Sequence, residues 1–77
     1  MKYVVVSPKK WREVCDANGY TKNDIMFCCY FAPIEANVVT RALWRDDDTP
    51  TAILLNTFLK CLKVSPKFEA AVIGKVD

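Results

Sequence analysis

The Ala32-Pro33 pair constrains the fold of this chain more than any other feature, because it interrupts a long helical pattern near the middle of the sequence. Proline has no amide donor and disfavours a helical conformation in the residue before it, so a helix must end or bend at Ala32. Apolar residues recur at helical spacing on both sides of the break, over residues 21–32 and 33–44. The sequence therefore predicts two short helices held at an angle.

The segment before this corner predicts a strand and a helix. Residues 1–6 form a β-branched run, which favours a strand because branched side chains restrict rotamers against a helical turn. Ser7-Pro8 suits the start of a helix from about Pro8 to Ala17, and Asn18-Gly19 suits its end. Thr21 and Asp24 have the spacing of a capping box at the start of the next helix.

The helix from Pro33 or Ile34 to Trp44 is predicted to be amphipathic. Spacing assigns its buried side to Val38, Val39, Ala42 and Leu43. The opposite side then carries Glu35, Asn37, Thr40 and Arg41. Valine and threonine are weak helix formers, so packing against neighbouring elements must stabilise this helix.

A fourth helix is predicted for residues 50–63. Thr49-Pro50 is typical of a helix start, and the aspartates at 46–48 suit the positive end of a helix dipole. Its apolar residues cover more than one face, which indicates burial on two sides or contact with a partner subunit.

The C-terminal segment leaves two possibilities open. Residues 68–72 favour a fifth helix, with a short strand from Ile73, but residues 70–76 could instead form a strand paired with residues 3–6. The preferred fold class is therefore mostly α, with four to five helices and a short N-terminal strand. The alternative is an α+β fold in which the terminal strands pair.

Composition narrows the functional classes. A chain of 77 residues with 52% apolar residues predicts one folded domain, and its apolar runs are too short to span a membrane. The net charge of +2 does not by itself indicate nucleic-acid binding, although the positive excess lies in residues 1–45. The first residues lack the pattern of a signal peptide, which predicts a cytoplasmic protein.

No residue pattern indicates catalysis or metal binding. The chain has no histidine, no CxxC pair and no glycine-rich phosphate loop. We therefore expect no enzyme activity, no cofactor, no small-molecule substrate and no metal site. The cysteines at 15, 28, 29 and 61 are interpreted as small buried residues.

The short helices, together with the segment TPTAILLNTFLKCLKVSP, resemble the small helix-turn-helix domains of the Cro and phage-repressor type. The resemblance covers roughly residues 9–72. In that family the second helix lies across the phosphate backbone, and the third enters the major groove. The resemblance implies a sequence-specific transcriptional regulator of phage or prophage character, acting in the bacterial cytoplasm as a homodimer on double-stranded DNA.

Carried onto this sequence, the resemblance gives two sets of DNA contacts. The expected base contacts lie on the helix at 34–44 and are Glu35, Asn37, Thr40 and Arg41. The expected phosphate contacts are Thr21, Lys22, Lys9, Lys10 and Arg45. The alternative is a small helical protein-binding module or a phage-encoded inhibitor of a host protein, which would use the same corner or the aspartate loop.

Overall fold

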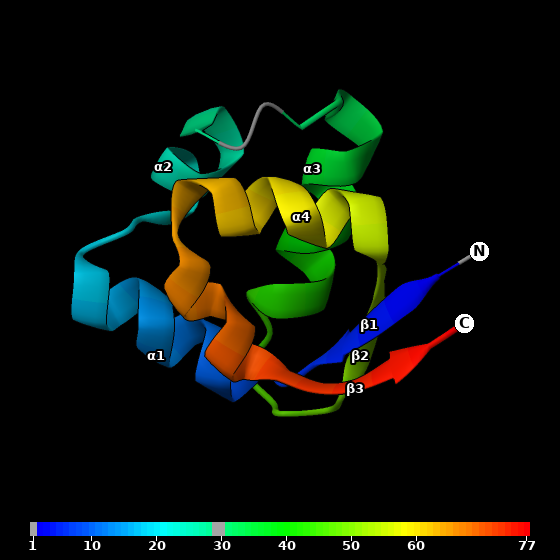
Figure 1. Ribbon diagram of the computed structural model, residues 1–77. Helices are drawn as coiled ribbons and strands as arrows, with labels where there is room; N and C mark the ends of the chain where they lie inside the picture. Colours follow the sequence, from blue (N-terminus) through cyan, green and yellow to red (C-terminus); the bar gives the residue numbers. More distant parts are fainter. Residues whose placement is uncertain (1, 29–30) are drawn as a thin grey trace.

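The computed structural model describes the backbone of residues 2–28 and 31–77, and the side chains of the same residues except 26–28. The described elements follow the order β1 (Tyr3–Val6), α1 (Pro8–Asn18), α2 (Lys22–Cys28), α3 (Pro33–Leu43), β2 (Thr51–Leu54), α4 (Leu55–Val64), the 3-10 helix η1 (Pro66–Ala71) and β3 (Val72–Val76). Figure 1 shows the helices gathered on one side of the strands, with both chain ends side by side.

The three strands form one antiparallel sheet in the order β2-β1-β3. Tyr3 pairs with Leu54 on one side and with Val76 on the other, so the N-terminal strand lies in the centre. The β1–β3 pairing shifts register between Val5 and Val6, as at a β-bulge. The α+β alternative, with paired terminal strands, is therefore confirmed.

Local signals for the first three helices are confirmed where the structure describes them. The Ser7 hydroxyl accepts a hydrogen bond from the Lys10 amide at the start of α1, and Gly19 ends that helix at φ 69°. A left-handed backbone favours glycine because it has no Cβ to clash. Thr21 and Asp24 exchange hydrogen bonds of 2.8 and 3.1 Å, which completes the predicted capping box.

The predicted helix at 50–63 was wrong in its first turn. Residues Thr51–Leu54 form β2, and α4 begins only at Leu55. Pro50 lies just before β2, where the strand pairing needs no amide donor, and pairing with β1 supplies the backbone hydrogen bonds that a helix would otherwise provide. The Leu55 amide continues this ladder to the Lys2 carbonyl at 2.9 Å. A strand followed directly by a helix explains why the apolar residues covered more than one helical face.

The C-terminal segment contains both predicted elements in sequence. Residues Pro66–Ala71 form η1, and Val72–Val76 form β3. The fifth helix is thus a 3-10 helix, and the strand begins one residue before the expected Ile73. The end of the second predicted helix and Cys29 lie outside the described residues, as does the Cys28 side chain.

Trp11 lies at the centre of the hydrophobic core and is fully buried. Its ring stacks on Phe68 with a centroid distance of 4.2 Å and meets Trp44 edge-on at 5.9 Å. Phe58 lies 6.5 Å away, so one side chain joins α1, η1, α4 and the end of α3. Cys15 and Cys61 are buried in the same core, as the sequence predicted.

The inner side of α3 differs from the prediction at one position. Val39, Ala42 and Leu43 are buried, but Val38 is 49% exposed and Ala36 is buried in its place. The core lies against one narrow side of α3, because the helix flanks the edge strand β2 and does not lie across the sheet. The spacing of apolar residues alone could not show which of the residues 36 and 38 is buried.

The loop that contains the aspartates at 46–48 caps α1 through Asp48. It does not cap the helix that follows it in the chain. One oxygen of Asp48 accepts hydrogen bonds from the Ser7 hydroxyl at 2.6 Å and from the Lys9 amide at 2.9 Å. These bonds, first from Ser7 and then from Lys9, hold the pKa of the Asp48 carboxyl below its usual range. The loop therefore joins the start of α1 to the start of β2.

We expect Asp48→Ala to lower the melting temperature, because two donors at the start of α1 lose their acceptor. Ser7→Ala should cost about 1 kcal/mol, as substitution of a helix cap commonly does. Thermal unfolding followed by circular dichroism measures both effects. Asp46→Ala, in the same loop, is the control. If Asp46→Ala destabilises as much as Asp48→Ala, the capping role of Asp48 is wrong.

Candidate nucleic-acid interface and the outer sheet face

The second and third helices follow one another in the chain, and α2 lies at one end of the molecule. The described part of α2 runs to Cys28, and α3 begins at Pro33. The Ile25 side chain is fully buried, and α2 packs against α4. In Figure 1, α2 and the start of α3 lie above α4, and α3 then passes behind that helix.

The side of α3 that faces away from the core carries two polar and two apolar residues. Ile34, Asn37, Val38 and Arg41 are all exposed, and they recur at the spacing of one helical face. Asn37 and Arg41 lie one turn apart. Asparagine and arginine are the side chains that most often form paired hydrogen bonds to adenine and guanine, respectively.

Glu35 lies on a different side of α3 and is bonded within the protein. One carboxylate oxygen accepts from the Ala32 amide and from the Lys60 ammonium, and the other accepts from the Thr57 hydroxyl at 2.8 Å. The Lys60 hydrogen bond is the largest cause of a lowered Glu35 pKa, followed by the bonds from Ala32 and Thr57. Glu35 therefore connects the start of α3 to α4.

Thr40 also differs from the two outward polar residues. Its hydroxyl oxygen is buried and has no hydrogen-bond partner among the described residues. A buried hydroxyl cannot reach a base edge without movement of its surroundings. Of the four expected base contacts, the structure thus places Asn37 and Arg41 together on the outward side and Glu35 and Thr40 elsewhere.

The expected phosphate contacts do not form one cluster. Thr21 and Lys22 lie at the start of α2, with the Thr21 hydroxyl accepting from the Asp24 amide. Arg45 pairs with Asp47 at 3.2 Å in the exposed loop after α3. Lys9 and Lys10 lie on the first turn of α1, where the Lys9 amide bonds Asp48.

Charge along α2 and α3 is sparse. The described parts of these helices contain two basic residues, Lys22 and Arg41, and two acidic residues, Asp24 and Glu35. The carboxylate of Asp24 is bonded to the backbone of Thr21, and that of Glu35 to Lys60. No continuous positive stripe runs along these described helices, but Arg41 and Lys22 are their exposed cations.

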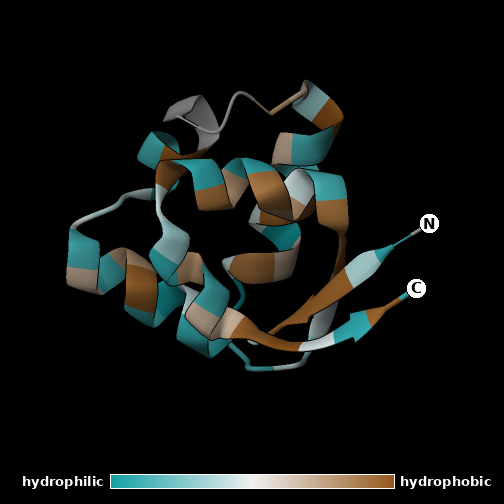
Figure 2. Cartoon of the chain, viewed as in Figure 1, coloured by the Kyte–Doolittle hydropathy of each residue, from teal (hydrophilic) through white to brown (hydrophobic). Residues whose placement is uncertain are grey.

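A second surface lies on the side of the sheet opposite to the core residues of the strands, and α3 borders it at the β2 edge. Val4, Val6 and Ile53 point into the core, so alternation along each strand directs their neighbours outward. We call this surface the outer sheet face. It consists of Tyr3, Val5, Ala52, Leu54, Gly74 and Val76. Figure 2 shows that β1 is hydrophobic along most of its length.

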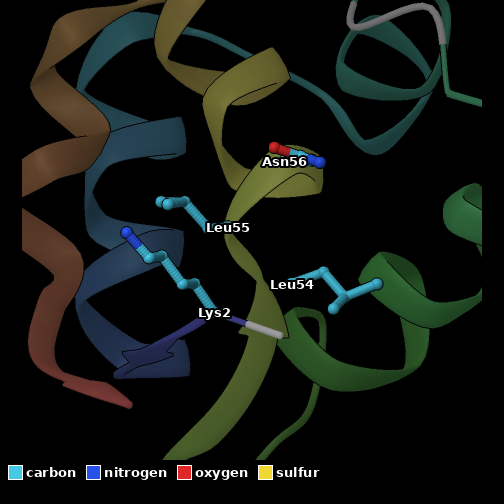
Figure 3. Close-up of a pocket in the computed structure, with 4 residues that line it drawn as sticks. All are labelled: Lys2, Leu54, Leu55 and Asn56. Carbon is cyan, nitrogen blue, oxygen red and sulfur yellow. The ribbon is translucent and has the colours of Figure 1, made fainter. Parts of the chain in front are cut away.

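The outer sheet face continues into a groove beside α3. A hollow of about 240 Å³ lies between α3 and β2 and is bordered by Ile34, Val38, Leu54 and Tyr3 among others. Figure 3 shows the Leu54 side chain pointing from β2 toward α3, whereas Lys2 and Leu55 lie on the other side of the strand. Those two residues line a separate pocket of about 300 Å³ with Leu54 and Asn56.

The outer sheet face was missed from the sequence, although a signal for it was present. An antiparallel strand with one solvent-exposed face alternates apolar and polar residues. Residues 3–6, by contrast, are apolar or aromatic throughout, and residues 52–54 contain no polar side chain. Continuous apolar runs of this kind are typical of strands covered on both faces. Without knowledge that 51–54 is a strand, the pattern could not be recognised.

The described residues contain no group of three histidine, cysteine or carboxylate side chains arranged to hold a metal ion. No described helix is long and apolar enough to cross a membrane. Comparison of the chain with protein families, curated proteins and solved structures found no match.

We expect Glu35→Gln to reduce the free energy of unfolding by roughly 0.5–1 kcal/mol, because the Lys60 pair is partly exposed to solvent. Since folding lowers the Glu35 pKa, this contribution is present above the ordinary glutamate pKa of about 4.3 and is lost as pH falls through the lowered value. Urea unfolding from pH 3 to 7 measures it. If the difference in free energy of unfolding between variant and wild type stays constant across this range, the stabilising role of the ionised Glu35 is wrong.

Proposed function

We propose that this protein binds double-stranded DNA through α3 and acts as a small transcriptional regulator of helix-turn-helix type. The observation that carries this proposal is the pair Asn37 and Arg41, exposed one turn apart on the outward side of α3. Both residue types can discriminate bases by paired hydrogen bonds in the major groove. The order of the chain supports the same function, because α2 and α3 are consecutive helices, as in helix-turn-helix units.

The placement of acidic groups also supports DNA binding by this unit. A carboxylate facing phosphate would oppose association, but the Lys60 ammonium balances the charge of Glu35. Lys22 at the exposed start of α2 then suits a phosphate contact, since a helix start also presents amide donors. Ile34 and Val38 can contact the methyl group of thymine beside the polar pair.

In this proposal the protein is a repressor of phage or prophage character, works in the cytoplasm of a bacterial host and binds as a homodimer. One small domain makes few base contacts, and a second copy adds the missing affinity. The base contacts assigned here are Asn37 and Arg41. Glu35 and Thr40 are left out because one is bonded to α4 and the hydroxyl of the other is buried.

Selection of bound duplexes from a random pool, followed by a salt titration, tests this function. Arg41→Ala should reduce discrimination at one base position by about 1–3 kcal/mol, the usual contribution of one paired contact. Lys22→Ala should weaken binding to all duplexes and reduce the salt slope by about one.

Lys63→Ala removes the same charge on the exposed end of α4 and is the matched control. We expect it to leave base preference and the salt slope unchanged. DNA binding by α3 is wrong if the wild type enriches no duplex at low salt, or if Lys63→Ala and Arg41→Ala change base preference equally.

A second candidate function, binding to a protein partner such as a host protein, is favoured by one observation. Ile34 is 78% exposed at the groove beside β2, and exposed apolar clusters mark protein contacts. A partner captured by the wild-type chain should then be lost with Ile34→Lys and retained with Arg41→Ala at high salt. The opposite result, with Arg41 required and Ile34 dispensable, would exclude an apolar contact of this kind.

A further inference from the structure

Asn18 and Gly19 lie where α1 ends, and they form the one Asn-Gly pair of the sequence. Asparagine is a chemically labile residue, and it is most labile before glycine, because no side chain there hinders approach to the glycine backbone nitrogen. The other asparagines precede residues with side chains, in the pairs Asn23-Asp24, Asn37-Val38 and Asn56-Thr57. Asn18 is therefore the asparagine of this chain with the greatest intrinsic tendency to lose its amide.

Loss of the amide, or deamidation, is an attack within the backbone. The Gly19 nitrogen loses its proton and bonds to Cγ of Asn18. The bond from Cγ to Nδ2 breaks, and Nδ2 leaves as ammonia with that proton. One water molecule then opens the resulting five-membered imide at either of its carbonyls, without oxidation or reduction. The product at position 18 is aspartate, or isoaspartate if the backbone then runs through Cγ.

Both reacting groups are hydrogen bonded within the folded protein. Nδ2 of Asn18 donates to the Val14 carbonyl at 2.7 Å, and its Oδ1 accepts from Lys67 Nζ at 3.1 Å. The Gly19 amide donates to the Asp16 carbonyl at 3.3 Å. The attack breaks two of these bonds, because the Gly19 nitrogen must lose its proton and Nδ2 must leave. The folded end of α1 therefore opposes the reaction.

Lys67 is the part of this arrangement that comes from a distant segment. It belongs to η1, which lies beside α1 (Figure 1), and its bond to Asn18 joins residues 49 positions apart. Nδ2 and Oδ1 belong to one planar group, so a bond to Oδ1 also holds Nδ2 toward Val14. Lys67 thus restrains the side chain in the orientation in which Nδ2 stays bonded.

We propose that Asn18 is a deamidation site of this protein, and that the end of α1 and Lys67 keep it closed in the folded chain. Helix ends open locally more often than the core does, and the reaction takes place in the open form. Its rate then follows the population of that form. The proposal does not rest on DNA binding, because Asn18 and Lys67 belong to neither α2 nor α3.

The two products have different effects on the end of α1. Isoaspartate adds one backbone carbon before Gly19, which displaces the amides of Gly19 and Tyr20 from the α1 carbonyls that they bond. Aspartate keeps the backbone. Its carboxylate cannot donate to Val14, but it can pair with the Lys67 ammonium. Isoaspartate should therefore lower the melting temperature, whereas Asn18→Asp should leave it close to that of the wild type.

Incubation of the full chain at mildly alkaline pH, followed by digestion and mass spectrometry, measures conversion at each asparagine. We expect Asn18 to convert at least about tenfold more slowly in the folded chain than in urea, because the open form is a minor population. In urea it should convert faster than Asn23, Asn37 and Asn56. Asn18→Gln should show no conversion at position 18 on the same timescale, because glutamine would need a six-membered ring.

Exchange of Lys67 tests the restraint. Lys67→Ala should speed conversion in the folded chain about threefold or more, the effect of losing one hydrogen bond to a charged group. Lys67→Met keeps the apolar part of the side chain and should give the same result, so that lost packing is not the cause. Lys63→Ala removes the same charge from the end of α4 and is the matched control. It should convert like the wild type.

Three results would overturn the proposal. Asn18 could stay intact in urea while other asparagines convert, which would mean that it is not a deamidation site. It could convert equally fast in the folded and the unfolded chain, which would mean that the end of α1 gives no protection. Lys67→Ala and Lys67→Met could leave the rate unchanged or lower it. A lower rate would mean that the ammonium activates the amide carbonyl and does not restrain it.

Discussion

The stacking of Trp11 on Phe68 is the contact on which the rest of the fold depends. It joins the first helix to the last helical turn, and the edge contact with Trp44 adds the end of α3. Aromatic rings bury large apolar areas, so few such contacts can hold a chain of this size together. Because Trp11 is fixed at the sheet end of α1, η1 must return there and place β3 beside β1.

The position of α3 follows from two contacts at its opposite ends. Trp44 joins its C-terminal end to the core, and Glu35 joins its first turn to Thr57 and Lys60 on α4. Valine and threonine in the middle of α3 have low helix propensity, so these tertiary contacts stabilise the helix. They also fix its rotation, which leaves Asn37 and Arg41 facing outward.

The sheet gives the protein two surfaces of different chemistry. The outward side of α3 combines polar Asn37 and Arg41 with apolar Ile34 and Val38, whereas the outer sheet face is uncharged. The core covers one face of the three short strands, and α3 borders the other face only at the β2 edge. A small protein of this design has an uncovered apolar face unless another chain packs on it.

The sequence by itself determined the helix starts and ends that depend on local chemistry. Ser7-Pro8, Gly19, the Thr21–Asp24 capping box and Pro33 all act through neighbouring backbone groups, so their effect could be predicted from adjacent residues. Tertiary structure decided that residues 51–54 pair with β1, that Asp48 caps a helix 39 residues earlier in the chain, and that Glu35 bonds α4. Of the candidate site, the sequence placed Asn37 and Arg41 outward but could not separate them from Glu35 and Thr40, because only packing against α4 and β2 fixes the rotation of α3. These contacts join distant segments, and no local pattern of residues specifies which distant partner a side chain will meet.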